Sequence, residues 1–237
     1  LAQGGAAGDR RSCEIALTLR GQVAMQGVPN LVAAKLKGRL QETVEEVRVD
    51  GARRVRLEYD FSPLEVNGML ASEAQFPRRL EASMLRAPGG GMEIQEAESP
   101  KGDMLAWIVR FLCGLAPLLP ASPVVVGERW EREWSLPAAG GGEFSAKAGG
   151  VLKGFSPGAG RRLAVLAVDG SAGLAKPPEG ETLETFRLEW SGTAGFDVEG
   201  GFVVFSEQEG TIRLKGRSGK SRVEARLGFT STLKPGV

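Results

Sequence analysis

The 237-residue chain contains no histidine. This absence excludes Ser-His-Asp and Cys-His catalysis, histidine-ligated zinc or haem, and a pH switch based on histidine. The two cysteines are too few for a four-cysteine zinc site. We therefore expect no metal and no cofactor, and we expect that the protein is not an enzyme.

Long apolar runs and an excess of one charge are also missing. No stretch reaches the roughly 18 apolar residues of a membrane-spanning helix, because Arg110 and Pro117 interrupt the best candidate at 104–119. The 30 basic and 29 acidic residues leave a formal net charge of +1, which offers no broad attraction to nucleic acid or to an anionic membrane surface. We expect neither nucleic-acid binding nor a membrane span.

Apolar and polar residues alternate over many short stretches, a pattern typical of half-buried antiparallel strands. Such alternation runs through residues 13–20, 54–61, 185–190, 211–215 and 222–229. Turn dipeptides such as Asp50-Gly51 and Asp169-Gly170 lie between such runs, and the segment 171–180, rich in Pro and Gly, is predicted to be a surface loop. The sequence therefore predicts a mainly β, antiparallel fold.

Short segments recur in the same order along the chain, which suggests two tandem, related β-units. The matched segments are 36–38 with 152–154, 49–51 with 168–170, 56–59 with 187–190, and 65–68 with 197–200. Coincidence in a glycine-rich β chain is the alternative. We predict a flexible N-terminal tail at 1–11, a first β-unit at 12–100, a helix with its connecting loop at 101–123, and a second β-unit at 124–237.

One apolar helix is predicted between the two units, at about residues 103–115. Asp103 can cap its start, and Gly114 and Pro117 end it. Apolar residues cover nearly its whole circumference, so we expect a bent sheet, a half-barrel or a pair of stacked sheets around it. Four aromatic side chains in and after this helix are the candidate ligand-binding residues: Trp107, Phe111, Trp130 and Trp134. A filled hydrophobic core is the alternative interpretation of these residues.

The motif formed by Pro120, Val126, Gly127 and Trp130, followed by a hairpin at 192–201, resembles uncharacterised exported β-rich proteins of bacteria. The duplicated layout, with one apolar helix against a bent sheet, is similar in architecture to half-barrel carriers of lipoproteins or lipids in the bacterial envelope. The resemblance implies an exported bacterial protein, located in the periplasm, on the cell surface or outside the cell. The small residues at the start of the sequence, which are typical of a trimmed export signal, favour the same expectation.

These features lead to one principal function and two alternatives. We expect a non-catalytic protein that binds an apolar or amphiphilic, lipid-like ligand, held mainly by burial of apolar surface at about 25 cal/mol per Å². The first alternative is an envelope or surface interaction module with a filled core, which binds a protein partner through a strand edge or an aromatic patch. The second is a hydrolase without histidine, for which Glu42, Glu45 and Glu46 are the densest acidic group. Cys13 and Cys113 are expected either to form a disulfide or to be two separate buried thiols.

Overall fold

The computed structural model describes residues 6–71, 78–86, 92–97, 120, 123–137, 142–158, 161–177, 183–199, 202–218 and 220–236. Within these ranges every strand pairing is antiparallel and no helix occurs. The mainly β, antiparallel fold predicted from the alternation is therefore confirmed. The helix predicted at 103–115 lies outside the described residues.

The strands before residue 100 are β1 (Arg10–Met25), β2 (Val28–Val47), β3 (Arg53–Phe61), β4 (Glu65–Val66), β5 (Met69–Leu70), β6 (Arg79–Arg86) and β7 (Met92–Ala97). The strands after it are β8 (Arg129–Pro137), β9 (Glu143–Gly158), β10 (Arg161–Lys176), β11 (Leu183–Asp197), β12 (Phe202–Ser218) and β13 (Ser221–Pro235). Several of these strands are unusually long, since strands commonly have about 5–6 residues. β2, for example, has 20.

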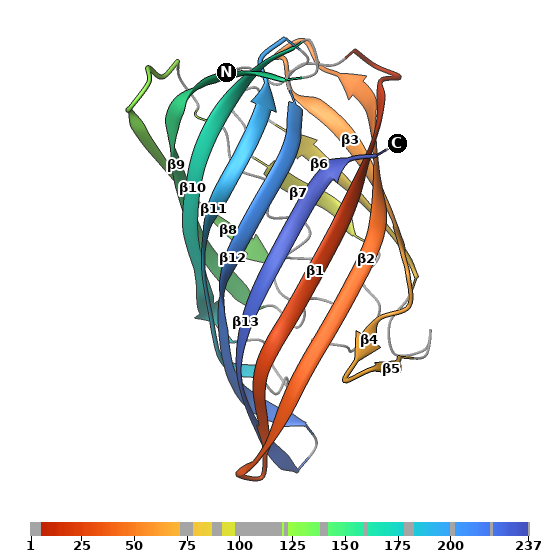
Figure 1. The fold of residues 1–237 in the computed structure, drawn as a ribbon, viewed down its shortest axis with the longest axis vertical. Coiled ribbons are helices and arrows are strands. Elements are labelled where there is room, and N and C mark those ends of the chain that lie inside the picture. The colour runs from red at the N-terminus through yellow and green to blue at the C-terminus, as the bar shows by residue number, and fades with distance from the viewer. Residues whose placement is uncertain are drawn as a thin grey trace.

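All the described strands belong to one sheet, whose main path runs β7-β6-β3-β2-β1-β13-β12-β11-β10-β9-β8. The short strands β4 and β5 form a hairpin beside β2. The pairing of β1 with β13 joins the two ends of the chain, so both predicted β-units lie in the same sheet. Figure 1 shows the sheet curled, with β6, β7 and β8 behind the front strands β12, β13 and β1. The predicted bent sheet is confirmed.

The curl separates an apolar face from a charged one. In β1 the alternate residues Ile15, Leu17 and Leu19 are buried, and β13 buries Leu227 and Phe229 in the same way. Their sequence neighbours point to the opposite side, as the pleat of a strand requires. We call the buried side the concave face and the opposite side the outer face.

Aromatic rings on the concave face lie over glycines of the neighbouring strand. The cross-strand pairs are Trp130 with Gly150, Trp190 with Gly170, Phe229 with Gly210, and Phe61 with Gly38. A Cβ atom built on Gly150 would lie 2.7 Å from the Trp130 ring, and one on Gly38 would lie 2.6 Å from the Phe61 ring. These glycines therefore make room for large rings on the crowded inner side of a curved sheet.

The segments of the predicted repeat occupy different positions in the sheet. Residues 49–51 form a turn after β2, whereas residues 168–170 lie within β10. The segments 36–38 and 56–59 lie on directly paired strands, whereas β10 separates the strands that carry 152–154 and 187–190. The prediction that these segments superpose as equivalent strands and turns is wrong. Strands with one apolar and one charged face share similar short patterns, and this explains the matches without duplication.

The sequence predicted a surface loop at 171–180. This prediction is wrong for residues 171–176, because β10 continues to Lys176. Ala172 is buried on the concave face and pairs in register with both Ala146 and Leu188. The dipeptide Asp169-Gly170 also lies in mid-strand, and its glycine lies beneath the Trp190 ring. Burial of small concave-face residues extends the strand past positions that resemble a turn in the sequence.

Candidate functional site

The concave face is the candidate ligand-binding surface. One cross-strand row on it, read from β13 to β8, consists of Leu227, Ile212, Leu188, Ala172, Ala146 and Trp134. All six belong to, or pack against, the main hydrophobic cluster of the protein. The row carries no hydrogen-bonding group except the indole of Trp134, so it favours an apolar ligand surface.

Two of the predicted site residues, Trp130 and Trp134, lie on β8 and face the same side of the sheet. Trp130 is 8% exposed and packs in a second cluster with Leu166 and Phe196. Trp134 is only partly buried and packs against the main cluster. Because β8 ends the described path of the sheet, Trp134 stands at the margin of the apolar face. Trp107 and Phe111 lie outside the described residues.

Two buried polar side chains interrupt the apolar face, and sequence reasoning missed them. Ser206 and Gln208 on β12 are 5% and 6% exposed, and the Gln208 amide nitrogen donates a hydrogen bond of 3.0 Å to the Ser206 hydroxyl. They pair in register with Ala194 and Gly192 on β11. The sequence does carry a signal for this pair. The alternation of apolar and polar residues breaks here, because polar residues occupy the positions that face inward. Both groups donate and accept hydrogen bonds without carrying charge.

Cys13 is a free, half-buried thiol that packs against the main hydrophobic cluster. Burial, chiefly, raises the pKa of this thiol, and the nearby Glu42 carboxylate adds to the effect. The thiol is thus held in its neutral form, which is the weaker nucleophile. Cys113 lies outside the described residues.

The side chains of Glu42, Glu45 and Glu46, the acidic group considered for a hydrolase, do not point toward a common site. Glu42 pairs with Arg11 at 3.7 Å, and Glu46 pairs with Arg48 and Arg54 at 4.0 and 3.9 Å. Glu45 is exposed. Within the described ranges, no group of three or more His, Cys, Asp or Glu side chains is arranged to hold a metal ion. In the same part of the chain, no helix is long and apolar enough to cross a membrane.

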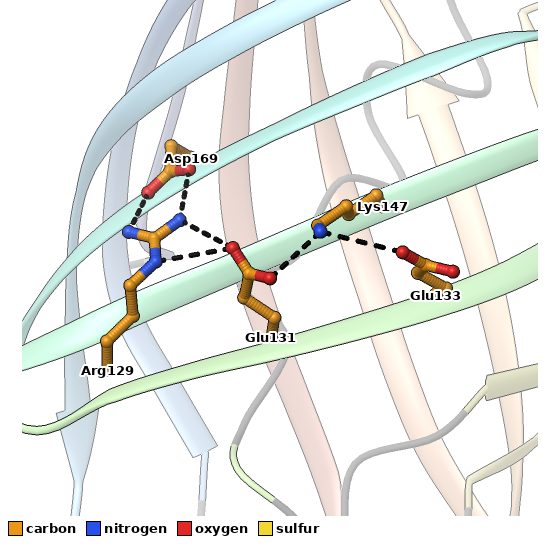
Figure 2. Close-up of polar contacts among 5 residues, drawn as sticks. All are labelled: Arg129, Glu131, Glu133, Lys147 and Asp169. Carbon is orange, nitrogen blue, oxygen red and sulfur yellow. Dashed lines mark hydrogen bonds and ion pairs between the residues drawn. The ribbon is translucent and has the colours of Figure 1, made fainter.

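The outer face carries an ion-pair network over β8, β9 and β10 (Figure 2). The Arg129 guanidinium donates two hydrogen bonds to the Asp169 carboxylate, at 2.9 and 2.8 Å. Arg129 also forms an ion pair of 3.2 Å with Glu131. The Lys147 ammonium forms ion pairs with both Glu131, at 2.9 Å, and Glu133, at 3.5 Å. The network pairs charges of both signs and leaves no concentrated charge for a ligand.

The network shifts the pKa values of its members in the directions that ion pairing requires. The hydrogen bond from Arg129 lowers the pKa of Asp169 below its ordinary value of 3.8. The hydrogen bond from Lys147, followed by that from Arg129, lowers the pKa of Glu131, and the pKa of Lys147 rises in return. These residues are largely exposed, so the network is a weak support of the sheet.

Replacing Asp169 by asparagine is expected to remove a small, pH-dependent part of the stability. The carboxylate has a lowered pKa in the folded protein, so its contribution is present above 3.8 and is lost as the pH falls through the folded-state pKa. Urea unfolding of wild type and Asp169→Asn should therefore differ at neutral pH and converge in strong acid. Glu207→Gln on β12 is the matched control. Equal differences at both pH values would contradict the ion-pair explanation.

No family model matches the sequence, and a search of curated proteins finds no significant match. Among solved structures, one that matches is a lipovitellin structure described for its lipid–protein interactions. It shares 10% sequence identity with this chain at a TM-score of 0.50. The match covers 98% of this chain and 25% of the lipovitellin chain, so the protein spans about a quarter of the length of that neighbour.

A second structure is an outer membrane channel from Pseudomonas putida F1, with 6% identity and a TM-score of 0.28. That match covers 98% of this chain and 97% of the channel chain, but the score is too low to support a common fold. The lipovitellin match shows a shared sheet architecture and nothing about chemistry. It agrees with the loose architectural resemblance predicted from the sequence.

Proposed function

We propose that this chain is a non-catalytic protein that binds an apolar or amphiphilic, lipid-like molecule against the concave face of its sheet. The observation that carries the proposal is the apolar row that continues across the strands to Trp134, at the margin of the described sheet. Binding would be driven by removal of apolar surface from water, at about 25 cal/mol per Å². The Ser206–Gln208 pair supplies an uncharged hydrogen-bonding point for the polar part of an amphiphile.

The architectural likeness to lipovitellin supports this proposal indirectly. That structure is described for its lipid–protein interactions, and its match extends over nearly all of this chain. A fold supports many functions, so the likeness raises the expectation of lipid binding without identifying the ligand. The resemblance to exported bacterial proteins leads us to propose, in addition, that the protein works in the bacterial envelope or outside the cell. Cell fractionation tests this location.

Fluorescence quenching by brominated phospholipid tests the ligand proposal. Trp130, Trp134 and Trp190 lie on the concave face, so brominated acyl chains bound there should quench tryptophan emission more strongly than the same lipid without bromine. Trp134→Phe should remove more of this quenching than Trp130→Phe, because Trp134 is the more exposed of the two. Native mass spectrometry of the purified protein should detect bound lipid.

Equal emission with both lipids, together with a protein mass free of lipid, would contradict the proposal. That result would favour the second candidate function, a module that binds an envelope protein. The observation behind this alternative is β8, an edge strand of nine residues within the described sheet. An edge strand presents backbone groups that can pair with a strand of a partner.

A further inference from the structure

The outer face contains a groove of about 860 Å³ that crosses the strands β1, β13, β12 and β11. Two cross-strand rows line it. The first row consists of Thr18, Thr230, Glu209 and Ser191. The second row consists of Arg20, Gly228, Thr211 and Glu189. We call this the outer groove, and it lies on the opposite side of the sheet from the proposed lipid surface.

Gly228 in the floor of the outer groove has no evident backbone role. Many mid-strand glycines of this protein are required by close contacts: a Cβ atom would collide with backbone oxygen at Gly21 and with the Trp190 ring at Gly170. At Gly228 the nearest atom to a Cβ would be the Arg20 backbone oxygen, at an ordinary 3.7 Å. A mid-strand glycine destabilises a strand relative to alanine, because glycine loses more conformational freedom on folding. The absence of a side chain at Gly228 leaves the outer groove open.

Gly173 on β10 is a second mid-strand glycine that has room for a side chain. A Cβ atom there would lie 3.6 Å from its nearest neighbour, the Phe186 backbone oxygen. Gly173 lines a second outer-face groove of about 450 Å³, together with Ser145, Ser171 and Lys147. Two glycines that tolerate a side chain thus each line a groove.

The lining of the outer groove indicates the class of ligand. Its two aromatic members, Trp190 and Phe229, direct their rings to the concave face over Gly170 and Gly210, so the side chains that face the groove are mainly polar and offer an acyl chain little apolar surface. The lining contains two carboxylates, Glu189 and Glu209, and one guanidinium, Arg20, a composition that disfavours a polyanion. The remaining lining groups are hydroxyls, which both donate and accept hydrogen bonds. This combination suits a neutral ligand rich in hydroxyl groups.

The charged groups of the groove differ in their existing contacts. Glu189 forms an ion pair of 2.6 Å with Arg187. Arg20 and Glu209 have no ion-pair partner within the described part of the chain. A carboxylate accepts, and a guanidinium donates, the charge-assisted hydrogen bonds that a hydroxyl group can complete. We propose that the outer groove binds a neutral glycan chain, with Glu209, Arg20 and the threonine hydroxyls as its hydrogen-bonding groups.

A glycan microarray that carries neutral and anionic oligosaccharides tests the proposal on the full chain. Wild type should bind at least one neutral oligosaccharide, and Gly228→Leu should weaken that binding by about tenfold or more, because leucine fills the groove. Thr232→Leu is the matched control, since it places the same side chain on the outer face of β13 outside the groove lining. It should bind as wild type does.

Glu209→Gln keeps the size of the side chain and removes the charge, so it should weaken binding by about threefold or more. It keeps the test decisive should Gly228→Leu fail to fold, which thermal unfolding would reveal. Absence of binding to every neutral oligosaccharide would overturn the proposal. Unchanged binding by both Gly228→Leu and Glu209→Gln would also overturn it. Neither result bears on lipid binding at the concave face.

Discussion

Replacing Phe196 by alanine is expected to lower the free energy of unfolding by about 3–5 kcal/mol, as for other fully buried phenylalanines. Phe196 on β11 is 0% exposed and packs with Trp130, Leu152 and Leu166 in the second hydrophobic cluster. Truncation would leave a cavity among the side chains of this cluster, which its neighbours can fill only in part. Urea or thermal unfolding measures the loss.

Phe155→Ala is the matched control for Phe196→Ala. Both phenylalanines pair in register with Ala164, from its two neighbouring strands. Phe155 is 43% exposed, and its ring lies 4.0 Å from the guanidinium carbon of Arg162. Its truncation removes an exposed cation–π contact and should cost less than about 1 kcal/mol. Similar losses for the two variants would show that the second cluster is loosely packed and contributes little to the fold.

The alternation in the sequence predicted the inward residues of several strands correctly. Val55, Leu57, Tyr59 and Phe61 are all buried, as are Phe186, Leu188 and Trp190. Alternation is a local property: each residue's side of the sheet depends on its immediate neighbours and on the pleat. The pairing of β1 with β13 is different, because it joins residues at opposite ends of the chain and leaves no local pattern.

The glycines show a second limit of the sequence. Gly170 follows an aspartate, and this dipeptide is a common turn signal. In the structure it lies in mid-strand because the Trp190 ring on β11 occupies the space where a side chain would stand. The requirement for glycine comes from a residue 20 positions away in sequence, which only the register reveals.

The candidate site, like the fold, was predictable only where it depends on the local alternation of residues. The sequence identified Trp130 and Trp134 as aromatics on one face of a strand, and the structure places both on β8 with their rings toward the hydrophobic clusters. The outer groove was not predictable, because its two rows bring together side chains from four strands. Thr18 and Ser191, for example, are joined in one row only through the pairings of β13 and β12.

Replacing Gly170 by alanine is expected to destabilise the protein by about 1–3 kcal/mol, the usual cost of overpacking a close-packed site. The added methyl group would overlap the Trp190 ring and would lie 2.7 Å from the Lys147 backbone oxygen. The ring has little freedom to move, because Trp190 is almost fully buried on the concave face. Relief would require β10 to separate from β9 or β11, and the hydrogen bonds of the sheet oppose that separation.

Gly228→Ala makes the same chemical change where the structure leaves room, with the nearest atom 3.7 Å away. It should be neutral or stabilising by up to about 1 kcal/mol, since alanine restricts the unfolded chain more than glycine does. Thermal unfolding of the two variants compares them directly. Equal destabilisation would show that mid-strand glycines are needed everywhere for the curvature of the sheet. A loss at Gly170 alone would show that the aromatic ring imposes the requirement, and that Gly228 is free to serve the outer groove.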